Sequence, residues 1–245
     1  MAEPVALITG AARRLGAVIA RTLHQRGLRV IIHCRNSTKE AAQLAAELND
    51  QRAQSACVLS ADLDHPEAVR QLARDVLQQW QRLDLLVNNA SAFYATPTGC
   101  SSDADWQRLM HSNLRAPYIL TESLAPALTE QRGAIINIID VYAEKPLRDH
   151  TLYCMAKAGL AMLTRSSARD LGPSVRVNGV APGPILWPQQ SQANQQAIID
   201  ATALKRCGTP VDVAEAVAFL ALDAGYVSGQ IMTVDGGRSL AFQGG

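Results

Sequence analysis

Short apolar runs alternate with longer, more polar stretches along the chain. The runs are rich in Val, Ile and Leu and are bounded by Gly, Asn, Asp or Pro, which predicts strands. The predicted strands are Val5–Thr9, Arg29–Cys34, Ser55–Ser60, Leu83–Val87, Gly133–Ile139, Val175–Val180 and Gln230–Val234. The stretches between them predict helices, among them Thr38–Arg52, Pro66–Trp80, a long helix that Ser101 or Asp103 caps, and Asp212–Leu222. Because strands and helices alternate throughout, we expect one α/β domain over residues 1–245, with a doubly wound parallel sheet of seven strands.

One polar segment interrupts this alternation. Residues at about 184–207 are Gln-rich and weakly patterned. A long segment of this kind in a compact domain is typical of an active-site lid. We therefore expect a substrate lid here, with one or two short helices.

Composition and charge exclude several classes of function. Of the 245 residues, 48% are apolar, and the formal net charge is +1. This balance gives no reason to expect nucleic acid or a membrane as a partner, and no apolar run is long enough to span a bilayer. The first four residues lack a basic-then-apolar leader, so we expect a cytoplasmic protein. The five cysteines have no Cys-x-x-Cys spacing, which argues against zinc or any other metal and against a disulfide framework.

A glycine-bearing turn follows the first predicted strand. The turn, Gly10-Ala11-Ala12-Arg13-Arg14-Leu15-Gly16, leads into a helical pattern that ends at Gly27, and the second strand follows. In such a βαβ unit the phosphates of a dinucleotide bind at the helix N-terminus. The position of the turn therefore points to a nucleotide site.

Tyr153 and Lys157 stand four residues apart in a predicted helix. They share one helical face, and an ammonium near a phenol favours the phenolate, which lowers a pKa that starts near ~10. Tyr153 is then a candidate proton donor or acceptor near neutral pH. The alternative is that both residues are simply exposed on a helix.

Several short motifs occur together in a characteristic order. They are Thr9-Gly10 with Gly16, Asp62, Asn88-Asn89-Ala90, Asn113, Tyr153-x-x-x-Lys157 and Pro182-Gly183. Over essentially its whole length the chain resembles the short-chain dehydrogenase/reductases. The resemblance implies a Rossmann fold, a nicotinamide cofactor, hydride transfer and a homotetramer.

The resemblance also implies roles for individual residues. Gly10 and Gly16 shape the pyrophosphate turn, Asp62 faces the adenine amino group, and Asn89 faces the adenine ribose. Lys157 holds the nicotinamide ribose, and Asn113 supports a proton relay through water. Further cofactor contacts are expected from Leu15, Leu63, Ala90, Pro182 and Gly183. Alternatively, Asp62 caps the helix that starts at Pro66, Asn89 is a turn residue and Asn113 satisfies buried backbone near a helix irregularity before Pro117.

Two positions depart from the family pattern. Arg14 stands where the family usually has glycine, and Asp140 stands where it usually has a serine that donates to a substrate carbonyl. An ionised carboxylate only accepts hydrogen bonds and repels a developing alkoxide. Both departures occur in pteridine reductases, which the chain resembles more specifically. That resemblance implies that Arg14 reaches the cofactor phosphate and the substrate, that Phe93 stacks on a pterin, and that Ser91 bonds the pterin edge.

The end of the second strand bears on the choice of cofactor. An NAD-preferring site usually has an acid there, whereas this chain has His33-Cys34-Arg35-Asn36-Ser37. Arg13, Arg35 and Ser37 suit a 2′-phosphate, so we expect NADPH. Trp187, in the lid, either walls the substrate pocket or packs the lid.

The expected reaction is hydride transfer from NADPH to a pterin C=N bond, with a pterin or folate as the small-molecule substrate. Tyr153, assisted by Lys157, protonates the ring nitrogen, and Asp140 orients Tyr153 or relays a proton. Two alternatives remain open at this point. One is a carbonyl reductase of the same fold, acting on a 3-oxoacyl or sugar ketone, and the other is a catalytically silent NADPH-binding sensor.

Overall fold

The sheet is the centre of the computed structural model, which describes residues 3–185 and 192–240, and the side chains of all of these except 192–194. Its strands are β1 (Val5–Ile8), β2 (Arg29–Cys34), β3 (Ala56–Ser60), β4 (Leu85–Asn88), β5 (Ala134–Ile138), β6 (Arg176–Pro182) and β7 (Ile231–Val234). They pair in the order β3-β2-β1-β4-β5-β6-β7, and all pairs are parallel. The predicted doubly wound sheet of seven strands is confirmed, with strand ends that differ from the predicted ones by at most two residues.

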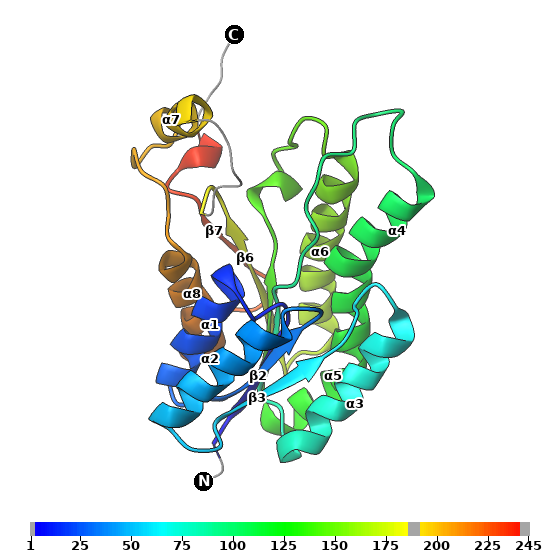
Figure 1. Cartoon of the computed structure of the whole chain (residues 1–245), viewed down its shortest axis with the longest axis vertical. Coiled ribbons are helices and arrows are strands. Elements are labelled where there is room, and N and C mark those ends of the chain that lie inside the picture. Colours follow the sequence, from blue (N-terminus) through cyan, green and yellow to red (C-terminus); the bar gives the residue numbers. More distant parts are fainter. Residues whose placement is uncertain (1–2, 186–191, 241–245) are drawn as a thin grey trace.

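Helices cover both faces of the sheet (Figure 1). One core cluster packs α1 (Arg14–Gln25), α2 (Thr38–Gln51) and α8 (Pro210–Ala218) on one face. A second core cluster packs α3 (Pro66–Trp80) and α5 (Ala116–Gln131) on the other face. The strands read as almost continuous apolar runs because their side chains are buried on both faces.

The remaining helices are α4 (Asp103–Met110), α6 (Thr151–Asp170) and α7 (Gln192–Asp200). Helix α4 is capped by Ser102, whose hydroxyl accepts from Asp105 N, so the predicted caps Ser101 and Asp103 were wrong by one residue. The last predicted helix starts two residues early, at Pro210, and ends in a π-helical turn, Phe219–Asp223. Within the described ranges, no helix combines the length and apolar character needed to cross a membrane.

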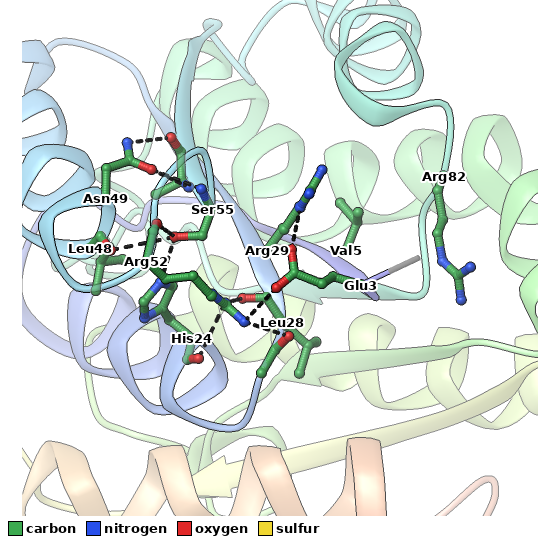
Figure 2. Close-up of polar contacts among 12 residues, drawn as sticks. Glu3, Val5, His24, Leu28, Arg29, Leu48, Asn49, Arg52, Ser55 and Arg82 are labelled. Atoms are coloured by element: carbon green, nitrogen blue, oxygen red, sulfur yellow. Dashed lines mark hydrogen bonds and ion pairs between the residues drawn. The ribbon is translucent and has the colours of Figure 1, made fainter. Parts of the chain in front are cut away.

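Arg52 links the segments that precede β1 and β2 at the amino edge of the sheet (Figure 2). Its guanidinium donates to the carbonyl oxygens of Gly27 at 2.9 Å and Leu28 at 2.5 Å, and it pairs with Glu3 at 3.1 Å. These bonds join the end of α2 to the turn between α1 and β2.

The strand order reverses its direction of growth between β1 and β4. In open parallel sheets, the loops after two such strands diverge and leave a crevice that binds ligands. The loops after β1 and β4 contain Gly10 and Asn89, respectively. The topology therefore places the predicted nucleotide turn at this crevice.

Candidate active site

A cavity of about 570 Å³ lies at the carboxyl edge of the sheet. It is lined by residues that follow five of the strands and by side chains of α1, α4 and α6. The predicted residues among them are Gly10, Arg13, Arg14, Leu15, Gly16, His33, Arg35, Asn36, Ser37, Asp62, Leu63, Asn89, Ala90, Ser91, Asp140, Tyr153, Lys157 and Pro182. The fold thus brings most of the candidate residues to one place.

The turn between β1 and α1 is closely packed at both of its glycines. A Cβ on Gly10 would lie 2.9 Å from Ala90 Cα, and one on Gly16 would overlap the Gly10 carbonyl oxygen. Gly10 also has a φ of +64°, which glycine adopts without steric strain. Arg13, at the N-cap of α1, makes no side-chain cap bond, so the helix offers amides that suit an anion.

His33 fixes this turn from β2. Its Nδ1 accepts from Gly10 N at 3.1 Å, and its Nε2 lies 3.2 Å from the Ala61 carbonyl oxygen. Both bonds are satisfied by a neutral ring that carries its proton on Nε2. Burial lowers the pKa of His33 to about 4, against smaller opposing effects of Ala61 and Asp62. His33 was predicted as a cofactor residue; it lines the cavity, and both of its ring nitrogens contact the protein backbone.

Asn89 also binds the turn. Its Nδ2 donates to the carbonyl oxygens of Thr9 at 2.8 Å and Gly10 at 3.2 Å, and its backbone N donates to Thr9 Oγ1. The side chain lines the cavity while its amide hydrogens are used within the protein. Thr9, which links β1 to β4 in this way, had no separate role in the sequence prediction.

Arg14 has a φ of +54°, in the left-handed region that favours glycine. The family's usual glycine at this position therefore fits the backbone, and the arginine is held there at a cost of about 1 kcal/mol. A residue kept in a strained conformation at the mouth of a cavity is a candidate for function.

Carboxylates face Arg13 and Arg35, which also line the cavity. Arg13 pairs with Glu40 at 3.3 Å, and Arg35 pairs with Asp64 at 3.1 Å and with Asp62 at 3.7 Å. Asp62 also accepts from Asp64 N, while the N-cap of α3 is His65, so the alternative of Asp62 as that helix cap was wrong. Asp64 follows the third strand, as Asp62 does, and it was not predicted, because an acid that would bind the ribose was sought only after the second strand.

At the other end of the cavity, Tyr153 Oη donates to Asp140 Oδ2 at 2.7 Å. Asp140 also accepts from Tyr142 N at 2.9 Å, which fixes its carboxylate. Lys157 is buried, donates to the Ile138 carbonyl oxygen at 2.8 Å, and lies 5.7 Å from the centre of the Tyr153 ring. The three groups form one hydrogen-bonded and charged cluster.

The protonation of this cluster differs from the expectation that Lys157 lowers the pKa of Tyr153. Burial, followed by the negative charge of Asp140, holds the pKa of Tyr153 well above its usual value. Burial also raises the pKa of Asp140 and lowers that of Lys157 to about 8. Tyr153 is therefore a neutral phenol that carries its proton near neutral pH.

Asn113 lies in a π-helical turn, His111–Arg115, between α4 and α5, which confirms the predicted irregularity. Its Nδ2 donates to the carbonyl oxygens of Ala92 and Leu109, and its Oδ1 accepts from Ser91 Oγ at 2.7 Å. Asn113 is fully buried behind the cavity. It therefore holds the β4 loop and Ser91 in place.

Phe93 is 47% exposed beside the cluster. Its ring stacks on His150 with a centroid distance of 4.8 Å and meets Tyr153 edge-on at the same distance. His150 was not predicted, and its proximity to Phe93 arises only from the fold.

Gly183 packs against Asp235. Trp187 lies outside the described residues. Part of the predicted lid also lies outside them, whereas its helix α7 is described.

Sequence reasoning missed several further cavity residues: Ala12, Cys34, Asp64, Ala92, Arg108, Ser112, Ile138 and Ile139. Six of them lie at or just after the carboxyl ends of predicted strands, so the rule that sites form at carboxyl ends would have included them. Across residues 3–185 and 192–240, no cluster of three or more His, Cys, Asp or Glu side chains is placed to hold a metal ion.

This fold, with its glycine turn and its buried tyrosine and lysine at one cavity, defines a dinucleotide-dependent oxidoreductase. A family model described as enoyl-(acyl carrier protein) reductase matches residues 10–239. The chain belongs to the short-chain dehydrogenase/reductase family, whose members use NAD(P)H and bind small-molecule substrates.

Named relatives differ in the reactions that their names describe. The chain is 36% identical to pteridine reductase 1 of Leishmania tarentolae, covering 97% of this chain and 96% of the relative. It is 33% identical to a 3-oxoacyl-[acyl-carrier-protein] reductase of Synechocystis, covering 95% and 96%. It is also 36% identical to nodulation protein G of a Rhizobium species, covering 96% of each chain.

Proposed function

We propose that this protein is an NADPH-dependent pteridine reductase that transfers hydride to a C=N bond of a pterin or folate. The observation that carries the proposal is the hydrogen bond from Tyr153 to Asp140. Reduction of C=N requires a proton at nitrogen and forms no alkoxide, so a carboxylate beside the reacting atoms is tolerable. The similarity to pteridine reductase 1 supports the same substrate class.

In this mechanism each residue has a defined part. The glycine turn and the N-terminus of α1 would hold the phosphates of NADPH, which would supply the hydride when bound. Tyr153 gives its proton to the ring nitrogen as the hydride arrives at the adjacent carbon. Asp140 orients the phenol, and the Lys157 ammonium offsets the charge left on Tyr153. Phe93 stacks on the flat ring of the pterin, and Arg14 reaches the cofactor phosphate and the substrate. Ser91 hydrogen-bonds the edge of the pterin.

The assembly in this proposal is a homotetramer, because enzymes of the family are commonly oligomeric. Exposed apolar side chains on α5 and α6, namely Tyr118, Met155 and Met162, support burial against another subunit. The residues at about 184–207, with α7 among them, are proposed to act as a substrate lid.

The test is oxidation of NADPH, followed by absorbance, with dihydrobiopterin, dihydrofolate, an oxidised pterin and a panel of ketones that includes a 3-oxoacyl thioester. Turnover of a pterin or folate is expected. Strong turnover of ketones with none of pterins would refute the proposal and favour a carbonyl reductase. Binding of NADPH without turnover of any substrate would favour a silent sensor.

Variants then test the roles of the cluster. Tyr153→Phe should abolish turnover while NADPH still binds, and retained turnover would reject the proposed acid. Asp140→Ser should lower pterin turnover by about 100-fold, the usual scale of a group in acid–base catalysis. Asp170→Ser, at the exposed end of α6, is the matched control and should leave turnover unchanged. If Asp140→Ser instead gains activity on ketones and keeps that on pterins, Asp140 does not select C=N substrates.

A further inference from the structure

At the end of the cavity formed by β2 and β3, arginine side chains are already paired with carboxylates of the same chain. Arg13 and Arg35 are the arginines suited to a 2′-phosphate, yet each is within ion-pair distance of a carboxylate of the chain. Asp62 adds a third carboxylate, 3.7 Å from Arg35. Two guanidinium groups thus face three carboxylates. An incoming phosphate therefore meets a site whose positive charge is already offset.

Among these carboxylates, Asp64 is the one best placed to compete for Arg35. Its contact with Arg35 Nη1, at 3.1 Å, is shorter than that of Asp62, and it forms a hydrogen bond. Its side chain is 24% exposed, against 38% for Asp62 and 40% for Glu40, so its charge is less screened by water. Asp62 is also occupied in accepting from the backbone of Asp64.

The backbone holds Asp64 in this position. Asp64 N donates to Asp62 Oδ1 at 3.0 Å, and the Asp64 carbonyl oxygen lies 2.8 Å from His111 Nδ1. The residue is therefore fixed between the β3 loop and the π-helical turn. Because its main chain is held on both sides, the carboxylate stays beside Arg35 and remains a lining residue of the cavity.

We propose that Asp64 is a specificity-determining residue that limits the preference of this site for NADPH over NADH. The inference rests on the proposed use of NADPH in this cavity. A 2′-phosphate has to take the Arg35 guanidinium from Asp64, and this competition weakens NADPH binding. NADH has a neutral hydroxyl at the same ribose position and does not compete for the guanidinium. Removing the carboxylate charge should therefore improve binding of NADPH alone.

The experiment measures Kd for NADPH and for NADH by fluorescence titration of the full chain and of Asp64→Asn, which keeps the size of the side chain. Kd for NADPH should fall about two- to fivefold in Asp64→Asn, the range for one exposed ion pair. Kd for NADH should stay unchanged, so the ratio of the two constants rises. Added salt should shrink the gain, because screening weakens the competition.

A double-mutant cycle ties the effect to Arg35. In an Arg35→Gln background, Asp64→Asn should no longer change Kd for NADPH. Asp170→Asn, at the exposed end of α6, changes the net charge equally and should leave both constants unchanged. Thermal unfolding of each variant confirms that the fold is kept.

Two results would overturn the inference: weaker or unchanged NADPH binding in Asp64→Asn, or an equal shift for both cofactors. No pterin enters the experiment, so its outcome is independent of the proposed substrate. If the unmodified chain binds NADH more tightly than NADPH, the cofactor choice in the proposed function fails. The direction of the change in NADPH affinity then still decides the role of Asp64.

Discussion

Lowering the pH from 7 to 5 should destabilise this protein through His33. The folded ring is buried and neutral because Nδ1 accepts from Gly10 N and Nε2 donates to the Ala61 carbonyl oxygen. A proton on Nδ1 would remove the acceptor for Gly10 N and place a charge inside the protein. The change therefore acts on the turn proposed to bind the cofactor phosphates.

The size of the effect follows from the two pKa values of His33. Burial lowers the folded-state value to about 4, whereas the unfolded chain titrates near ~6.5. Between these values the unfolded chain binds a proton that the folded chain does not, so the free energy of unfolding decreases as the pH falls. The linkage relation gives a loss of about 2 kcal/mol between pH 7 and pH 5, and about 3 kcal/mol by pH 4.

Urea unfolding at pH 7 and pH 5, on the unmodified chain and on His33→Asn, measures this loss. Asparagine does not titrate and retains an acceptor near Gly10 N, although it gives up the contact with Ala61. The variant should start less stable at pH 7 but lose about 2 kcal/mol less on acidification. Burial also lowers the pKa of His24, but that residue is present in both proteins, so its contribution cancels. Equal losses in both proteins, or an NMR titration of His33 near its usual pKa, would refute the reasoning.

Two further substitutions test strain and burial. Arg14→Gly should raise the free energy of unfolding by about 0.5–1 kcal/mol, because glycine accepts a positive φ, while it lowers pterin turnover. Arg132→Gly, at a φ of +51° just beyond α5, is the control in urea unfolding: it should raise the free energy of unfolding and leave turnover unchanged. If neither substitution raises the free energy of unfolding, the backbone at these positions is not strained. Arg52→Met should lower the free energy of unfolding by about 3 kcal/mol, since it leaves the Gly27 and Leu28 carbonyl oxygens without their donor and leaves Glu3 paired with Arg29 alone. NADPH affinity, measured in parallel, should be unchanged because the site lies at the other edge of the sheet, and a stable Arg52 variant would contradict the role shown in Figure 2.

Much of the fold could be predicted because its determinants are local. A strand buried on both faces is a short apolar run between breakers, as in β2 and β5, and this feature depends on no distant partner. The ends of the helices were harder to predict, because the residue at which a helix starts depends on a single capping side chain. Ser101, Ser102 and Asp103 are all acceptable caps by type, and only the path of the loop selects Ser102.

Most residues that line the cavity were named from the sequence, whereas the energetics of the site were not. Positions at strand ends, together with the resemblance to a family, were enough to group Gly10, Asn89 and Asp140 around one cavity. The pKa of Tyr153 depends on burial and on which oxygen accepts its proton, and neither is encoded near it in the chain. The pairing of Arg35 with Asp64 likewise joins residues 29 positions apart across two strands. Side-chain pairing of this kind becomes visible only when the strand order is known.

The π-helical turn that holds Asn113 makes the geometry of this site depend on how helix α4 is rotated about its axis. Helix α4, the turn at His111–Arg115 and α5 follow one another without a break. One residue of an α-helix corresponds to about 100° of rotation, so a single deletion within the turn would rotate α4 about its axis relative to α5. Leu109, which is buried against Tyr153, would then leave its place while the strand order stayed the same. Changing the length of this turn by one residue would therefore alter the surroundings of Tyr153 while the strand order of the sheet stayed the same.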